Sequence, residues 1–228
     1  MISKRNSEDR GHAGFGWLDT WHTFSFSSYQ DPRHMGVSAL RVINQDVINA
    51  RTGFPAHSHD NMEILTYVLR GAVSHRDSMG NEARVPAGEF QLMSAGTGVT
   101  HSEYNLDSEP LELLQIWLFP NVENADPRYQ QKRFADNVDG LQLVVSPDGA
   151  EDSLEIRQDA RIYRGQLKSG QDVAHTLIGR AGYVQVIHGE ITVNGTILQD
   201  GDGAEISQET KVEFSAHKDS EFLFFDLP

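Results

Sequence analysis

Two short motifs carry the residues best suited to bind a metal ion. The first is a His-x-His pair, His57 and His59, and the second is a His-x-Glu pair, His101 and Glu103. Side chains two positions apart on a β-strand project from the same face of the strand. If both strands line one barrel, all four side chains converge. Imidazole and carboxylate groups suit one divalent transition metal (Fe, Mn, Co, Ni, Cu or Zn), with positions left open for water or substrate.

The alternative for each histidine is an ordinary hydrogen-bonded side chain, and for a single His-x-His pair that alternative is the stronger one. Two such pairs together make a metal site the stronger interpretation. Histidines packed face to face inside an apolar barrel each need a polar partner, and a buried glutamate needs a compensating charge, so one divalent cation would satisfy all four groups. The chain has no cysteine, which excludes thiolate ligands, disulfides and a cysteine nucleophile.

The elements that position these motifs are short strands. Apolar residues alternate with period two and are interrupted by Gly, Pro, Asn and Asp, and sustained helical periodicity is missing. This pattern predicts an all-β fold built from sandwiches or barrels. The predicted strands are Ile64–Leu69, Leu92–Ser94, Leu111–Phe119, Tyr183–Ile187, Glu190–Val193 and Phe222–Leu227.

The polar, proline-containing stretch after the second motif predicts a division of the chain. We expect an N-terminal metal-binding barrel at residues 1–120, a linker at 121–140 and a C-terminal barrel at 141–228. An internal repeat supports this division, because superposing Gly71 on Gly189 sets His57 opposite His175. The second copy has no later His-x-Glu pair and is expected to hold no metal.

Composition limits the partners of the protein. A chain of 228 residues with a formal net charge of -14 argues against direct binding of nucleic acid, since such binding depends on clustered Lys and Arg. An acidic, solubilising surface is the simpler interpretation. No apolar run is long enough for a membrane span or a signal peptide, so we expect a cytoplasmic protein with no membrane partner. Two barrels in one chain make a monomer the expected state.

Glycines frame both histidine motifs, and three segments near the N-terminus complete a wider pattern. The motifs are Gly53-x3-His57-x-His59-x3-Glu63 with Gly71, and Gly88 with Gly96-x-Gly98-x2-His101-x3-Asn105. The segments are Trp21–Phe26, Asp31–Gly36 and Leu40–Val42. Over most of residues 14–120 this pattern resembles the pirin branch of the cupin superfamily, although the glycine-to-histidine spacing of the first motif is shorter than the superfamily pattern. The resemblance implies two tandem, jelly-roll-like cupin barrels, one metal in the N-terminal barrel and, in bacterial members, quercetin 2,3-dioxygenase activity.

The resemblance leaves two carboxylates as candidate ligands. Many cupins take the carboxylate from the first motif, here Glu63, whereas pirins resemble a variant that takes it from the His-x-Glu pair, here Glu103. Strand parity does not choose between them, because position 63 shares odd numbering with both histidines of the first motif. We expect Glu103 to be the ligand and Glu63 to support the site.

The resemblance also implies a mechanism and a competing function. A small planar aromatic flavonol such as quercetin would bind the metal, Glu103 would accept its proton as general base, and O2 would open the ring with release of carbon monoxide and a phenolic ester. The alternative is a regulator that binds a protein partner and responds to the redox state of the metal. A closed barrel that uses the metal only for structure ranks last.

The remaining histidines show no ligand pattern. His12, His22 and His34 belong to an aromatic-rich N-terminal segment that we expect to pack as a strand, with some of its aromatic residues as candidates for the pocket entrance. We expect the others to be ordinary polar residues; they are His75, His175, His188 and His217.

Overall fold

The computed structural model describes residues 1–136 and 138–228, and β-strands make up most of them. The only helices in these two ranges are the short 3-10 turns η1 (Ser7–Asp9) and η2 (Ala150–Asp152). No helix of the described chain is both long and apolar enough to cross a membrane. The predicted all-β class is confirmed.

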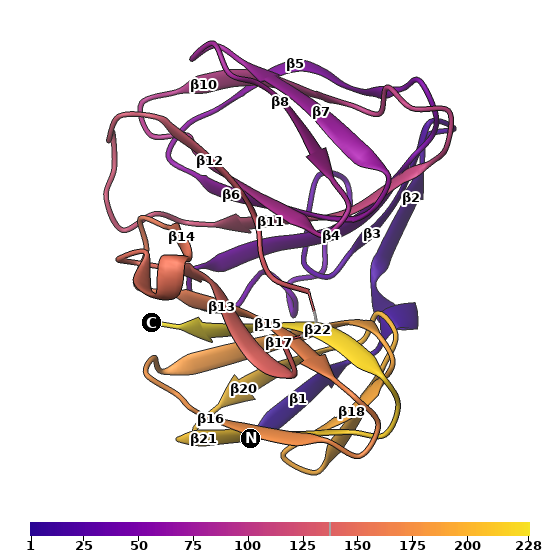
Figure 1. Cartoon of the computed structure of the whole chain (residues 1–228), viewed down its shortest axis with the longest axis vertical. Coiled ribbons are helices and arrows are strands. Elements are labelled where there is room, and N and C mark those ends of the chain that lie inside the picture. Colours follow the sequence, from indigo (N-terminus) through magenta and orange to yellow (C-terminus); the bar gives the residue numbers. More distant parts are fainter. Residues whose placement is uncertain (137) are drawn as a thin grey trace. The chain divides into compact units, whose positions relative to one another are not determined.

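The chain forms two compact units. Residues 11–36 and 40–134 make one unit, which we call the N-terminal barrel. Residues 1–10, 37–39 and 135–228 make the other, the C-terminal barrel. The first ten residues, which we expected in the N-terminal domain, thus belong to the C-terminal barrel. Figure 1 shows their strand in indigo among the orange and yellow strands of that barrel.

Two antiparallel sheets build the N-terminal barrel, and Figure 1 shows them facing each other. The seven-stranded sheet has the order β12 (Arg128–Arg133), β9 (Glu89–Ser94), β6 (Glu63–Arg70), β11 (Leu111–Leu118), β4 (Leu40–Ile48), β3 (Leu18–His22) and β2 (Gly11–Gly14). The four-stranded sheet has the order β5 (Gly53–His59), β10 (Val99–Tyr104), β7 (Ala72–Asp77) and β8 (Glu82–Pro86).

Side chains from both sheets meet in the interior, where alternate residues of each strand are buried. One cluster of fully or nearly fully buried aliphatic residues packs between the sheets; it comprises Leu18, Ile48, Val68, Val73, Val85, Leu111 and Leu113. A smaller cluster of Ile64, Met93 and Val99 packs against Trp117. The polar residues described below are also buried in this barrel.

Strand β12 lies within the stretch predicted to be a linker. Its six residues, Arg-Tyr-Gln-Gln-Lys-Arg, pair antiparallel with β9 along their whole length. The strand lies at the edge of the seven-stranded sheet, and its side chains are mostly half-buried. An edge strand of this kind needs no alternation of apolar and polar residues, because backbone hydrogen bonds to one neighbour hold it in place. The sequence pattern therefore did not indicate it.

The C-terminal barrel repeats the same plan. Its seven-stranded sheet has the order β1 (Ile2–Arg5), β20 (Gly203–Ser207), β17 (Ala181–His188), β22 (Ser220–Leu227), β15 (Arg161–Leu167), β13 (Gly140–Ser146) and β14 (Leu154–Glu155). Its four-stranded sheet has the order β16 (Asp172–Thr176), β21 (Lys211–Ala216), β18 (Glu190–Val193) and β19 (Thr196–Gln199). The order β16-β21-β18-β19 matches β5-β10-β7-β8, and His175 on β16 corresponds to His57 on β5. The predicted repeat is confirmed.

Candidate metal centre

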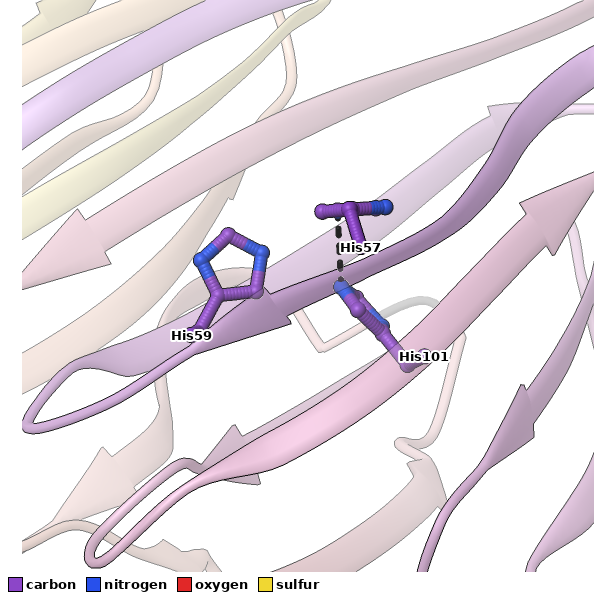
Figure 2. A group of neighbouring side chains, drawn as sticks. All are labelled: His57, His59 and His101. Carbon is purple, nitrogen blue, oxygen red and sulfur yellow. Dashed lines mark hydrogen bonds between the residues drawn. The ribbon is translucent and has the colours of Figure 1, made fainter.

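Three histidines converge from two neighbouring strands of the N-terminal barrel. His57 and His59 lie on β5, and His101 lies directly opposite His57 on the antiparallel strand β10. Figure 2 shows the three rings turned toward one another. The ring centroids are separated by 4.5 Å for His57 and His101, 4.9 Å for His57 and His59, and 5.0 Å for His59 and His101. A ring nitrogen of each lies within 4.8 Å of one from each of the others, as a shared cation requires.

A β-bulge on β5 sets how the two strands pair: the three residue steps from His57 to Phe54 oppose only two steps on β10. The pairing with β5 shifts by one residue between His101 and Glu103, so that Glu103 lies opposite Phe54. Bulges of this type redirect side chains and are common beside functional sites. The tight pairing beyond the bulge depends on Gly53, because a Cβ there would lie 2.3 Å from the backbone oxygen of Glu103.

Hydrogen bonding and burial prepare the rings to bind a cation. The Nδ1 of His57 lies 2.8 Å from the carbonyl oxygen of Pro55. A carbonyl can only accept, so Nδ1 carries the hydrogen and the Nε2 lone pair stays available. That Nε2 lies 3.1 Å from the Nε2 of His101 (Figure 2). Burial, together with the neighbouring histidines, lowers the pKa of His101 to about 3 and the pKa of His59 to about 4. Both rings are therefore neutral at pH 7, which is the form that binds metals.

Glu103 is the carboxylate that shares a cavity with the three histidines. Its side chain is buried, and both oxygens accept hydrogen bonds: Oε2 from Gln115 at 2.9 Å, and Oε1 from Gln91 at 3.3 Å and Thr66 at 3.5 Å. Glu63 is also buried, but it accepts a bond of 2.8 Å from Ser94 and does not line the cavity. Glu103, and not Glu63, therefore lines the cavity with the three histidines, and one of its oxygens lies within 4.8 Å of a ring nitrogen of His101.

The cavity has a volume of about 370 Å3, within the usual range for small-molecule sites. Aromatic residues form much of its wall; they are Phe15, Trp17, Phe26, Phe54 and Trp117. Three of them come from the aromatic-rich N-terminal segment, which confirms that some of its residues line the pocket. A polar part of the wall is formed by Thr20, His22, Asn44, Asp46 and Gln115. Its shape and lining suit a planar aromatic molecule that also carries hydrogen-bonding groups.

Asp46 is a feature of this cavity that the sequence did not reveal. It is buried and accepts a hydrogen bond from Thr20. Burial, with the nearby charge of Glu103, raises the pKa of Asp46 to about 7, although the Thr20 bond works in the opposite direction. This carboxyl group can therefore donate or accept a hydrogen bond near neutral pH. No spacing rule links a lone aspartate on β4 to ligands on two other strands.

Two histidines that we expected to be ordinary polar residues have little exposed surface: the side chain of His75 has none, and that of His175 is 13% exposed. His75 lies on β7, bonds to Asp77 at 3.0 Å, and has its ring centroid 5.3 Å from that of His101. His175 in the C-terminal barrel bonds to the buried Asp226 at 2.9 Å. In each of them one ring nitrogen, Nε2, is paired with a carboxylate, so both are polar side chains held by hydrogen bonds. For His75 the signal was present: Asp77 follows two residues later, on the same strand face.

Comparisons with known proteins agree with this geometry. A family model described as Pirin matches residues 4–118, and one described as Quercetinase C-terminal cupin domain matches residues 143–227. The chain is 54% identical over 230 residues to the quercetin 2,3-dioxygenase of Escherichia coli (strain K12), covering 100% of this chain and 99% of that protein. It is 40% identical over 230 residues to a pirin-like protein of Caulobacter vibrioides, covering 99% of each. The crystal structure of the bacterial pirin YhhW from Escherichia coli in complex with nickel(II) matches with a TM-score of 0.97 at 53% identity, covering 100% of this chain and 99% of that one. The predicted two-cupin fold is confirmed.

Proposed function

This chain belongs to the pirin family, and from that premise and the histidine-lined cavity we propose that it is a metal-dependent dioxygenase that cleaves a flavonol with O2. One observation carries the proposal. The imidazoles of His57, His59 and His101 and the carboxylate of Glu103 open onto the same aromatic-walled cavity, so a bound cation and a planar substrate would share one space.

The residues fit one divalent transition metal. We propose the ligands to be His57, His59, His101 and Glu103. The nitrogen and oxygen donors suit such an ion, the Nε2 atoms of His57 and His101 face the same point, and the rings of His59 and His101 are neutral at pH 7. A relative in complex with nickel(II) supports the same class of ion. On an ion that takes six ligands, four protein ligands would leave two positions for substrate.

The aromatic wall would orient the substrate. Trp117 packs edge-on against His59, with ring centroids 5.0 Å apart, and against Phe26 at 5.3 Å. Trp17 packs in the same way against Phe54 at 5.0 Å. Rings braced by other rings keep their orientation and offer flat faces and edges to a flavonol. The named activity of the 54% identical relative, a quercetin 2,3-dioxygenase, supports quercetin as the substrate to test.

Glu103 would take the proton from the substrate. When bound, the divalent ion would supply the positive charge that lowers the pKa of a flavonol hydroxyl. Glu103 lines the same cavity and is held by Gln115 and Gln91, so it would accept that proton as general base without turning away from the site. The cavity would meanwhile exclude bulk water from the deprotonated flavonol. Addition of O2 and loss of carbon monoxide from the central ring would leave a phenolic ester.

The test is turnover of quercetin by protein loaded anaerobically with a first-row divalent metal and then exposed to O2. We expect one carbon monoxide and one phenolic ester for each quercetin consumed, over many cycles. His57→Ala and His101→Ala should abolish both products, whereas His188→Ala, an exposed histidine of the C-terminal barrel, should not. Absence of both products with every metal tried would refute the enzymatic proposal.

A further inference from the structure

Strand β7 places a second histidine–carboxylate pair next to the candidate ligands of β10. The two strands pair antiparallel, with Asp77 opposite His101 and His75 opposite Glu103. The side chains of His75 and Asp77 have no exposed surface. Residues opposite each other on paired strands project from the same face, so this pair points into the barrel beside the ligands.

Asp77 determines which nitrogen of His75 carries the hydrogen. Its Oδ2 lies 3.0 Å from the Nε2 of His75, and its Oδ1 accepts backbone bonds from Met79 at 2.9 Å and Asn81 at 3.0 Å. Burial would raise the pKa of Asp77, but the bonds from His75 and Asn81 outweigh it and lower the pKa. An ionised carboxylate only accepts, so the Nε2 of His75 is the donor. In a neutral ring the Nδ1 is then left as an acceptor.

Both His75 and His101 have a buried Nδ1 atom that makes no hydrogen bond within the described residues. The ring centroids of these two histidines are 5.3 Å apart, and a ring nitrogen of each lies within 4.8 Å of the other. The Nε2 of His101 faces His57, so a cation bound there would leave the hydrogen of His101 on Nδ1. A ring whose buried donor lacks an acceptor therefore lies beside a ring whose buried acceptor lacks a donor. A buried polar atom left unpaired in this way is unfavourable.

Tyr129 restricts the ring of His75 to one orientation. The two rings stack with centroids 4.8 Å apart and an interplanar angle of 29°. The hydroxyl of Tyr129 hydrogen-bonds with Gln91 at 3.2 Å and Gln131 at 3.0 Å. A ring held by Asp77 at one edge and by Tyr129 over one face has little freedom to change its orientation beside His101.

We propose that His75 is a positioning residue for the ligand His101: Asp77 fixes the tautomer of His75, and the Nδ1 of His75 accepts the hydrogen on the Nδ1 of His101. The inference rests on the proposed metal site and concerns metal affinity, not turnover. The bond would hold the His101 ring with its Nε2 toward the cation and make that nitrogen more basic. Residues that orient metal ligands in this way typically contribute about 10–100-fold in metal affinity.

The test compares two substitutions of His75 by competition for zinc with a chelator of known affinity. His75→Phe keeps the ring and removes the acceptor, so we expect a loss of about 10–100-fold in affinity. His75→Asn places an amide oxygen where Nδ1 lies, and we expect it to retain most of the affinity. Wild-type affinity in His75→Phe, or equal losses in both variants, would overturn the proposal. Circular dichroism and melting of the metal-free variants check that each folds.

Asp77→Asn tests the same bond without changing either histidine. The substitution keeps Oδ1 for the turn amides and sets an N–H donor against the Nε2 of His75. His75 would then carry its hydrogen on Nδ1, facing the N–H of His101. We expect zinc affinity to fall at least as far as in His75→Phe, and an unchanged affinity would contradict the assigned tautomer.

Proton magnetic resonance of the cobalt(II)-loaded protein supplies a readout that general loss of stability would not mimic. The ring N–H of His57, bonded to Pro55, is an internal reference. We expect the shifted N–H signals of His57 and His101 both to exchange slowly with water in the wild type, and only that of His101 to be lost in His75→Phe. An unchanged His101 signal would overturn the inference. A protein that binds cobalt but does not cleave quercetin would refute only the dioxygenase, whereas a wild type that binds no cation would refute both.

Discussion

Each residue of the candidate site brings a different property. His57 has its tautomer fixed by a backbone carbonyl, and His101 is held neutral by burial. Glu103 is held by two glutamines and a threonine, which fixes a carboxylate oxygen in the cavity. These local interactions orient the donor atoms before a cation arrives, so little conformational freedom remains to be lost on binding.

The two buried glutamates should respond differently to the same substitution. We expect Glu103→Gln to weaken zinc binding by more than the roughly 10–100-fold typical of residues outside the ligand set, because it removes a ligand charge. Glu63→Gln should leave zinc affinity within that range or unchanged, since Glu63 bonds to Ser94 outside the cavity. Chelator competition measures both. A larger loss in Glu63→Gln would assign the carboxylate ligand to Glu63.

Asp46 should make the metal-free protein sensitive to pH. Its pKa is about 7 in the folded state against 3.8 for the ordinary side chain, so the folded state holds a proton that the unfolded chain releases. This proton stabilises the folded state fully below pH 3.8, and the stabilisation is lost as the pH rises to 7. Asp46→Asn keeps the acceptor for Thr20 and does not titrate. The free energy of unfolding of Asp46→Asn minus that of the wild type should therefore be about 2 kcal/mol larger at pH 8.5 than at pH 5.5.

Urea denaturation at the two pH values measures this difference. The comparison should be made with and without zinc, because a cation near Glu103 changes the charge that Asp46 experiences. A constant difference between variant and wild type in the metal-free protein would contradict the raised pKa of Asp46.

At the scale of elements, three adjacent strands deliver the whole site. β5 supplies two histidines, β10 supplies the third and Glu103, and β7 supplies the pair behind them. The site therefore depends on close pairing of these strands as much as on the residues themselves. The bulge on β5 sets the register at which the two strands that carry the candidate ligands meet.

Gly53→Ala should disturb this pairing. The added Cβ would meet the backbone of Glu103 and Tyr104 at 2.3 and 2.5 Å, and backbone at that distance must move. We expect a loss of about 1–3 kcal/mol in the free energy of unfolding, together with weaker zinc binding. Gly14→Ala on β2 is the matched control, because its Cβ would have only Asp19 Oδ1 nearby, at 4.0 Å. Equal behaviour of the two variants in denaturation and chelator competition would contradict the role of Gly53.

Periodicity and spacing predicted some of these elements and missed others. Apolar alternation indicated β6, β11 and β22, and the two ligand pairs were visible because residues two apart share a strand face. The sequence did not predict β12, because an edge strand with polar, half-buried side chains has no such alternation. The sequence did not indicate Asp46 as a site residue, because Glu103 affects its pKa only when separate strands come together. Sequence can indicate residues on one face of one strand, but not which strands adjoin.

At the scale of the whole molecule, the same fold is used twice with different interiors. In the C-terminal barrel, Val212 lies opposite His175 at the position that His101 holds opposite His57. Val212 and Phe214 are fully buried in an apolar core, and His175 is paired with Asp226. Aliphatic and aromatic side chains lie here at positions that candidate ligands hold in the other barrel. The described part of the C-terminal barrel contains no group of three potential ligands.

One metal ion per chain is therefore expected, and His175 should play no part in binding it. His175→Ala should leave the zinc stoichiometry at one while lowering the free energy of unfolding by about 1–3 kcal/mol, because the buried Asp226 loses one of its hydrogen bonds and keeps those from the backbone of Ile178 and Gly179. Metal analysis after dialysis and urea denaturation measure the two effects. His188→Ala, at a mostly exposed position, should change neither. A stoichiometry of two in the wild type, reduced to one by His175→Ala, would contradict an apolar second barrel.

The most direct measurement of the central claim is an anomalous difference map from crystals of the zinc-loaded protein. We expect one peak per chain, about 2.0–2.2 Å from a ring nitrogen of each of His57, His59 and His101 and from a carboxylate oxygen of Glu103. A peak bound to other side chains, or no peak in the N-terminal barrel of a fully loaded crystal, would contradict the assignment of the site and the function proposed from it.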